Sequence, residues 1–437
     1  MEIPEGVEIP TTRPPTAEYS RPIVCRLLKS IYGLKQSPRA WYGRINDSFI
    51  TNGFIRSDAD HSLYINYAKQ VILLLCVDDL VLAAPTKDTI NWIRHRLHQE
   101  FDMTDIGQLT TFLGLEIKRN RTNRTLFLSQ IKYINKILET FGMQRCNPAA
   151  TLADPHIRLE KSNPEYEATV ADRLRYQSAV GSLMYAMLGT RPDIAYPVAK
   201  VSQFSMNPNI THWTAVKRIF RYHAGTTNRG LYYGLEGIGK GFTNADWGGG
   251  DDWKSIGGFA FLLNGAAISW NSKKQATVAL SSTEAEYMAL TQATKESIWL
   301  QQLLLNLGAR KHIAEVSKIV VDNQGAIALA KTPEYHARTK HIDIQYHFIR
   351  EHLESGKITL DYCPGPTNEM TADIFTKPLP QPAFTRHNIG LGLTHQSVPL
   401  LQHSEFQESN LQEGAPVRGG VVDHRRSPDH DSFYPTA

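Results

Sequence analysis

Two adjacent aspartates, Asp78 and Asp79, interrupt an otherwise apolar run that covers residues 71–82. Neighbouring carboxylates flanked by buried strands repel each other, which is costly unless a cation lies between them. Magnesium prefers carboxylate oxygens and brings phosphates with it, so the pair could belong to a phosphoryl-transfer site. An acidic hairpin turn exposed to water is the alternative, and the pair alone favours neither. A two-metal centre also needs ligands from another strand, and no upstream acid lies on an apolar strand.

A second set of acids is dispersed through the C-terminal half, at predicted strand ends and helix starts. Serine or threonine precedes both Glu284 and Glu286 at capping-box spacing, so either glutamate could simply cap a helix. Asp322 could cap the next helix, and Asp373 could favour the positive end of its own. Because α/β sheets gather ligands at strand ends, their convergence nevertheless indicates a divalent-metal site. The set comprises Asn244 with Asp246, Glu284, Glu286, Asp322 and Asp373.

Basic residues cluster around the turn of a predicted hairpin, whose strands cover residues 113–118 and 125–129. A cationic tip could hold phosphates. A solvated charged turn is the commoner explanation on composition alone. The residues concerned are Lys118, Arg119, Arg121 and Arg124.

Hydrophobic periodicity predicts the elements that must position these residues. In the N-terminal half it predicts helices at residues 37–52, 86–101 and 131–141, and strands at 62–65 and 71–84. Helices at 176–188, 194–204 and 213–223 follow, in a region without evident chemistry. Strands at 230–233, 241–245, 258–263 and 266–271 then precede a long helix at 283–307 and alternating strands and helices up to about residue 380. This order predicts a mixed sheet with flanking helices, in a multidomain protein of the α/β and α+β classes.

Composition sets wider limits. The 437 residues are 41% hydrophobic, and Lys plus Arg (47) exceed Asp plus Glu (43) only slightly, which excludes a wholly disordered or strongly polybasic chain. No apolar stretch approaches the ~20 residues of a membrane span, so we expect no membrane partner. Four scattered cysteines indicate neither a disulfide framework nor a zinc site: Cys25, Cys76, Cys146 and Cys363.

Several collinear motifs resemble the Pol polyprotein of copia-type LTR retrotransposons, in its reverse transcriptase and ribonuclease H regions. The resemblance extends from about residue 1 to residue 393. The motifs are RLLKSIYGLKQSPRAWY at residues 26–42, CVDDL at 76–80, FLGLEI at 112–117, VGSLMY at 180–185, RPDI at 191–194, LSSTEAEY at 280–287, VDN at 321–323 and ADIFTKPL at 372–379.

For the polymerase, the resemblance implies that Asp78 and Asp79 are metal ligands. It places Gln36, Ser37 and Pro38 near the template and the incoming nucleotide. The family has a first polymerase aspartate just before the point where this chain starts, so we expect the polymerase part to be inactive.

For ribonuclease H, the resemblance implies metal ligands at Glu286, Asp322 and Asp373, with a further aspartate in the first strand. Glu286 is preferred over Glu284 because the run EYMA best resembles the first helix of ribonuclease H. The first-strand position falls at Asn244, which lacks the charge of the family's aspartate and should weaken metal binding.

Asp246 shares the strand face of Asn244, because side chains repeat every two residues, and is a possible substitute. The implied cofactor is Mg²⁺ at two-metal sites, and the implied partner is an RNA–DNA hybrid. Basic residues such as Arg119, Arg121 and Arg124 would grip its backbone. Replication in cytoplasmic particles is the family's behaviour, and the oligomeric state stays open.

The resulting hypothesis is a retrotransposon RNA-directed DNA polymerase fragment, a nucleotidyltransferase in ancestry, joined to an endonuclease that cleaves the RNA strand of hybrids. A non-catalytic nucleic-acid-binding remnant is the alternative. The predicted domains are an extended segment (1–22), a partial palm and thumb (23–146), a linker and helical connection (147–229), a ribonuclease H-like domain (230–380) and a mostly disordered tail (381–437).

Overall fold

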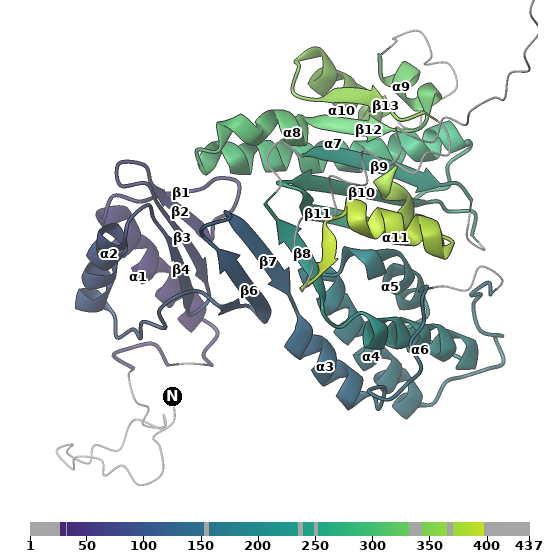
Figure 1. Ribbon diagram of the computed structural model, residues 1–437, viewed down its shortest axis with the longest axis horizontal. Helices are drawn as coiled ribbons and strands as arrows, with labels where there is room; N and C mark the ends of the chain where they lie inside the picture. Colours follow the sequence, from purple (N-terminus) through teal and green to yellow (C-terminus); the bar gives the residue numbers. More distant parts are fainter. Residues whose placement is uncertain are drawn as a thin grey trace, which may run out of the picture. The chain divides into compact units, whose positions relative to one another are not determined.

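The computed structural model describes residues 27–31, 33–152, 157–234, 239–248, 252–331, 343–364 and 370–396. The described residues up to Thr394 belong to one compact unit (Figure 1). The predicted N-terminal segment, Cys25 and all but the first residues of the predicted tail lie outside the described residues.

The N-terminal region is an antiparallel sheet in the order β1-β2-β3-β4, with two helices on one face. Alternate residues of β3 are buried, and Leu73 joins Phe49 of α1 and Ile93 of α2 in one core, so both helices cover the same face. The predicted helices and the hairpin around Asp78 are confirmed. The elements are α1 (Ser37–Thr51), β1 (Ile55–Arg56), β2 (Leu63–Asn66), β3 (Val71–Cys76), β4 (Asp79–Ala83) and α2 (Lys87–Glu100).

The middle region combines a second sheet, in the order β14-β8-β7-β6-β5, with a group of helices. The predicted hairpin of β6 and β7 and the four predicted helices are confirmed. The elements are β5 (Thr111–Phe112), β6 (Leu115–Asn120), β7 (Thr125–Ser129), α3 (Ile131–Thr140), α4 (Val170–Gly189), η1 (Pro192–Ile194), α5 (Ala195–Ser202), α6 (Ile210–Gly225) and β8 (Arg229–Tyr233).

One strand lies in a different sheet from the one that the sequence predicted. β8 pairs with β7, with Leu128 opposite Leu231, and does not join the C-terminal sheet. Strand periodicity identifies a strand but carries no information about its neighbour, which long-range packing selects.

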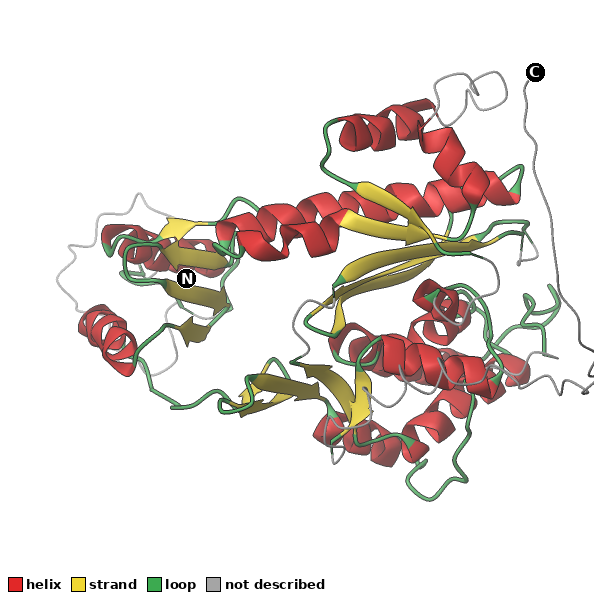
Figure 2. Cartoon of the chain, turned by 45° about the horizontal axis from the view of Figure 1, so that its top comes forward, coloured by secondary structure: helices red, strands yellow, loops and turns green. Residues whose placement is uncertain are grey.

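The C-terminal region is a mixed sheet, as predicted, and its strands lie in the order β11-β10-β9-β12-β13. Both faces are covered: Phe261 packs with the α7 side chains in one core, and Leu262 belongs to the core shared with the middle helices. The long helix α7 runs beside this sheet (Figure 2). The elements are β9 (Lys240–Asp246), β10 (Ile256–Leu263), β11 (Ala266–Lys274), α7 (Ser282–Asn306), η2 (Arg310–His312), α8 (Ile313–Ser317), β12 (Lys318–Val321), α9 (Gln324–Lys331), α10 (Asp343–Glu354) and β13 (Thr359–Tyr362).

The chain beyond residue 370 differs from the prediction in two ways. The predicted final helix is a short 3-10 helix, η5 (Thr371–Phe375), and the first residues assigned to the tail form α11 (Gln381–Gly390) and β14 (Leu393–His395). Phe384, Leu391 and Leu393 are buried in the core that includes the middle helices. Tertiary burial therefore orders a segment that has only a weak amphipathic pattern of its own.

Candidate functional site

The aspartate pair lies at the tight turn of the β3–β4 hairpin. Cys76 pairs with Asp79, so Val77 and Asp78 form a two-residue turn. Val77 has a φ of 56°, which β-branched residues rarely adopt, and the Trp41 indole donates a hydrogen bond to its carbonyl at 3.1 Å. Both aspartates are exposed, as the acidic-turn alternative expects. Metal binding by this pair remains a prediction.

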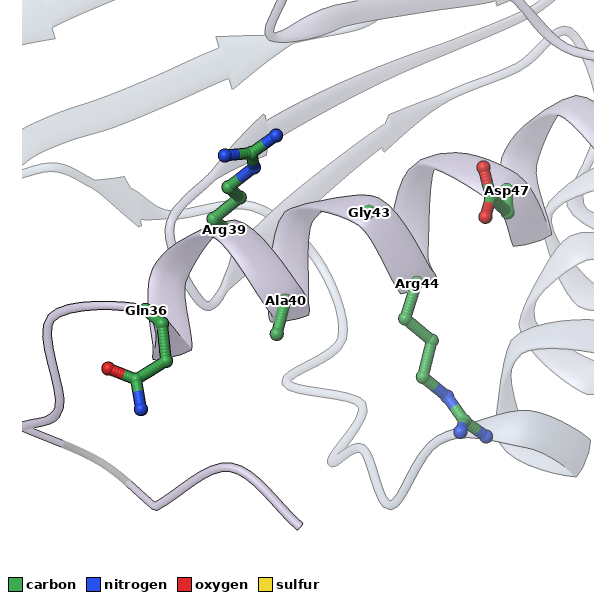
Figure 3. A pocket seen from close by; sticks show the side chains of 6 residues that line it. All are labelled: Gln36, Arg39, Ala40, Gly43, Arg44 and Asp47. Atoms are coloured by element: carbon green, nitrogen blue, oxygen red, sulfur yellow. The ribbon is translucent and has the colours of Figure 1, made fainter.

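The Gln-Ser-Pro motif forms the start of α1. Gln36 is the N-cap residue, and the Ser37 hydroxyl donates to the carbonyl of Ile31 at 2.6 Å, while Pro38 lies in the first turn. Trp41 follows on the same helix, so its hydrogen bond to the hairpin holds the motif in a set position relative to the aspartate pair. A hollow on this helix is lined by Gln36, Arg39, Ala40, Gly43, Arg44 and Asp47 (Figure 3).

The basic cluster lies at an exposed hairpin tip. Asn120 pairs with Thr125 across the strands, and the Asn120 side chain accepts a hydrogen bond from the backbone of Asn123 at 3.1 Å. This bond shapes the turn that presents the cations. Lys118, Arg119, Arg121 and Arg124 are all exposed. The structure therefore confirms the hairpin, and phosphate binding remains a prediction.

The structure brings the dispersed acids of the C-terminal half to one edge of the mixed sheet. β12 runs parallel to β9, with Val320 opposite Phe242, so Asp322 follows β12 at the level of Asn244. Asn244 and Asp322 also share a sheet face, because each lies two residues beyond one of that pair. α7, which carries Glu286, and η5, which carries Asp373, both pack against β9.

Asp373 is held by two donors at a single oxygen. The side-chain amide of Asn244 donates a hydrogen bond to Asp373 Oδ1. The ammonium of Lys377 forms an ion pair with the same Oδ1 at 3.0 Å. The residue that replaces the expected aspartate therefore contacts another predicted ligand directly.

Glu286 carries the most deeply buried carboxyl group of this edge. It is only 5% exposed, and its Oε2 atom has no hydrogen-bond partner. Burial, with the neighbouring carboxylates of Asp322 and Asp373, raises the pKa of Glu286 to about 9. Burial and the Asp373 carboxylate also raise the pKa values of Asp322 and Asp246.

Hydrogen bonds show whether Glu284 and Asp322 act as helix caps. The Glu284 carboxylate accepts from the backbone of Leu280 at 2.9 Å, so Glu284 caps the start of α7, as the capping alternative expects. The next helix, α9, is capped instead by Asn323, whose side chain accepts from the backbone of Ala326 at 2.9 Å. Asp322 is therefore not needed as that cap.

The acids at this edge form a charged group rather than a closed metal cage. Among the described residues, no set of three or more His, Cys, Asp or Glu side chains is arranged so that it could enclose a metal ion. The donor chemistry still suits a divalent cation, because Glu286 Oε2 is buried, unpartnered and close to two other carboxylates. Metal binding at this edge remains a prediction.

Sequence reasoning missed a buried polar network in the middle region. Arg191 and Asp193 are completely buried and bonded through both carboxylate oxygens, at 2.9 and 2.8 Å. Arg191 also bonds His223 and Thr226. The Tyr222 hydroxyl donates to Asp193 at 2.6 Å. The RPDI motif was the available signal, but an Arg-x-Asp spacing does not by itself predict burial.

No helix in the described ranges combines the length and apolar character that crossing a bilayer requires. No disulfide bond joins the described cysteines, which are Cys76, Cys146 and Cys363.

Comparison with known proteins identifies relatives for most of the chain. Residues 6–155 match the family model of reverse transcriptase (RNA-dependent DNA polymerase). The retrovirus-related Pol polyprotein from transposon TNT 1-94 of Nicotiana tabacum is 42% identical over 393 residues, which are 88% of this chain and 28% of that polyprotein. The corresponding polyprotein from transposon RE1 of Arabidopsis thaliana is 38% identical over 85% of this chain and 25% of its own length.

A shorter relative is covered almost completely. The putative transposon Ty5-1 protein of Saccharomyces cerevisiae is 32% identical over 289 residues, which are 62% of this chain and 89% of that protein. The chain itself spans about a quarter of the length of the plant polyproteins. The matching sequence thus includes the reverse transcriptase region and continues through the C-terminal sheet that carries the acids. The chain belongs to the family of copia-type retrotransposon Pol polyproteins.

Proposed function

We propose that the acidic edge of the C-terminal sheet, which comprises Asp246, Glu286, Asp322 and Asp373, is a ribonuclease H site that cleaves the RNA strand of RNA–DNA hybrids. The observation that carries the proposal is the Glu286 carboxyl group, which is buried, has an unpartnered oxygen and faces the charges of Asp322 and Asp373. A structural role for three acids at one edge would leave their repulsion only partly compensated, by Lys377, whereas a catalytic role requires them together.

Glu286, Asp322 and Asp373 would hold Mg²⁺ at this edge, with Asp246 beside them. When bound, Mg²⁺ would activate a water molecule and stabilise the leaving oxygen of the RNA strand. Glu286 accepts a hydrogen bond from the backbone of Ala245, which orients its carboxyl group toward the end of β9. Asp373 is oriented by Asn244 and Lys377.

Asn244 is the main argument for the alternative, a non-catalytic nucleic-acid-binding remnant. It keeps the shape of an aspartate but donates a hydrogen bond to Asp373, where a second carboxylate would attract a cation. Asp246 lies on the same strand face and close enough to Asp373 for the two charges to interact. It is the residue that could replace the missing charge.

A cleavage assay on an RNA–DNA hybrid with Mg²⁺ separates these alternatives. The purified chain is compared with Asn244→Asp, Asp246→Asn and Glu286→Gln, and hybrid binding is measured in parallel. Cleavage by the unaltered chain that is lost in Asp246→Asn supports Asp246 as the substitute. Cleavage only after Asn244→Asp supports an inactive remnant of a ribonuclease H. Absence of cleavage in every variant, with hybrid binding retained, would reject the enzymatic proposal.

For the N-terminal region we propose a coarser role, as the part of a reverse transcriptase that presents the catalytic hairpin. Asp78 and Asp79 would bind metal, and Gln36, Ser37 and Pro38 would lie near the template and incoming nucleotide. The hydrogen bond between Trp41 and Val77 supports this proposal, because it couples the motif to the hairpin.

A hairpin alone does not complete a two-metal centre. Primer extension would therefore require further metal ligands besides Asp78 and Asp79.

A further inference from the structure

Lys377 is a half-exposed cation that contacts the acidic edge, where the proposed chemistry needs no positive charge. Its ammonium lies 3.0 Å from Asp373 Oδ1, the same atom that accepts from the Asn244 amide. We propose that Lys377 is the built-in counter-ion of the acidic edge, which with Asn244 occupies the Asp373 oxygen and so lowers the affinity of the edge for divalent cations. The inference rests on the proposed function, because it concerns the metal-binding group of that site.

The local backbone holds Lys377 in this position. η5 is anchored by the Ser272 hydroxyl, which donates to the carbonyl of Phe375 at 2.6 Å. Phe375 and Thr376 are completely buried, so the residue that follows them leaves the core at a defined point. Asp373 and Lys377 are four residues apart, a spacing that brings the two side chains together across one turn.

Lys377 interacts with more carboxylates than its ion-pair partner Asp373. Its ammonium is close enough to interact electrostatically with Asp246, Glu286 and Asp322, in addition to its contact with Asp373. Lys200 acts in the same way on Asp246. Among the described residues, Lys377 is thus the cation that faces all these acids.

The Lys377–Asp373 pair differs from an ordinary surface ion pair. Its aspartate side chain is 19% exposed, whereas in the Lys318–Asp361 pair on the same sheet both side chains are 46% exposed. Screening by water makes such exposed pairs weak, while a half-buried pair beside further carboxylates is screened less. Lys318 lies at the start of β12, and Asp322 follows the end of that strand, so Lys318 provides a matched control.

Removal of the Lys377 charge should have two opposite effects. Without a divalent cation, the carboxylates lose their counter-ion, and the protein should become less stable. With a divalent cation, the competitor for Asp373 is gone, and affinity should increase by about tenfold, the effect expected for one nearby unit charge. Lys377→Arg keeps the charge and should show neither change in full.

The experiment measures Mn²⁺ binding, through the decrease of the free-ion electron paramagnetic resonance signal, and the melting temperature in EDTA. The full chain is compared with Lys377→Met, Lys377→Arg and the control Lys318→Met. We expect tighter Mn²⁺ binding and a melting temperature lower by a few degrees for Lys377→Met only. Unchanged or weaker Mn²⁺ binding by Lys377→Met, or no detectable binding by any of these proteins, would overturn the proposal.

Hybrid cleavage separates this inference from the function on which it rests. Tighter Mn²⁺ binding by Lys377→Met without cleavage by the unaltered chain or by Asn244→Asp supports the counter-ion and rejects the ribonuclease. Cleavage by the unaltered chain with equal Mn²⁺ binding in Lys377→Met and Lys318→Met supports the ribonuclease and rejects the counter-ion.

Discussion

Two buried charged groups in this chain are built in opposite ways. In the middle region, Arg191 uses all five of its N–H donors, on Asp193, His223 and Thr226, and its charge is matched by one carboxylate. At the acidic edge of the C-terminal sheet, Glu286 is similarly buried, but its Oε2 has no partner and the carboxylates of Asp322 and Asp373 lie near it.

The difference indicates what each group is for. A buried ion pair with every donor satisfied is compatible with a purely structural role, because it needs nothing from solution. A surplus of buried and partly buried carboxylates is stable only with protons or cations, which suits a site that binds metal. Although burial opposes its charge, Asp193 is ionised, since Arg191 holds its pKa below the usual value, whereas the pKa of Glu286 is raised to about 9.

The largest expected effect concerns the buried ion pair of Arg191 and Asp193. Arg191→Met leaves the Asp193 carboxylate buried without its partner, which should lower the free energy of unfolding by about 3–5 kcal/mol. Urea denaturation measures this change. The control Arg94→Met breaks the exposed pair of Arg94 with Asp105 and should cost no more than about 1 kcal/mol. Equal effects of the two substitutions would remove the distinction between buried and exposed pairs.

The next largest effect is an increase in stability. Glu286→Gln removes a buried carboxyl group with one unpartnered oxygen, and should stabilise the metal-free protein at pH 8 by about 2 kcal/mol while it abolishes hybrid cleavage. Thermal unfolding in EDTA gives the stability. Glu284→Gln, two residues earlier on α7, weakens a cap and should destabilise slightly. A destabilised Glu286→Gln protein would show that the carboxylate is structurally compensated after all.

The pH dependence of stability should have opposite directions for Glu286 and for His223. The folded pKa of Glu286, about 9, exceeds its unfolded value of 4.5, so its contribution to stability is present at low pH and is lost as pH rises toward 9. Burial and Arg191 hold the pKa of His223 well below 6.5, so its contribution is present above pH 6.5 and is lost as pH falls below it.

Melting temperatures in EDTA between pH 5 and 9 test both signs. Glu286→Gln should flatten the alkaline side. His223→Gln should reduce the acid-side slope of the free energy of unfolding by about 1.4 kcal/mol per pH unit at most. Part of that acid slope should persist in His223→Gln, because burial also lowers the pKa values of His212, His352 and His387. An alkaline slope that is identical in Glu286→Gln would assign it to other groups.

The smallest effect on stability is expected for charges that are exposed altogether. Arg119→Ala and Arg121→Ala at the β6–β7 tip should change the free energy of unfolding by less than about 0.5 kcal/mol. Hybrid affinity should fall, and the slope of log affinity against log salt should decrease by about one for each phosphate that the tip no longer binds. An unchanged slope would mean that the tip is only a solvated turn.

The sequence by itself determined most of the local structure. Period-3.6 and period-2 patterns predicted α1, α2, α7 and the hairpins, because those elements bury one continuous face and their side chains repeat with the backbone. The same patterns missed α11, whose burial depends on a distant core, and assigned β8 to the wrong sheet. Composition and motifs also placed candidate acids at the ends of the correct elements.

Only the tertiary structure decided which of those acids form a group. Glu284 and Glu286 are two residues apart on a helix and so point in nearly opposite directions; one caps α7 and the other faces Asp322 and Asp373. The bond of Asn244 to Asp373 and the burial of Arg191 with Asp193 likewise depend on packing between distant segments. Charge compensation is a property of neighbours in space, and sequence spacing does not encode it.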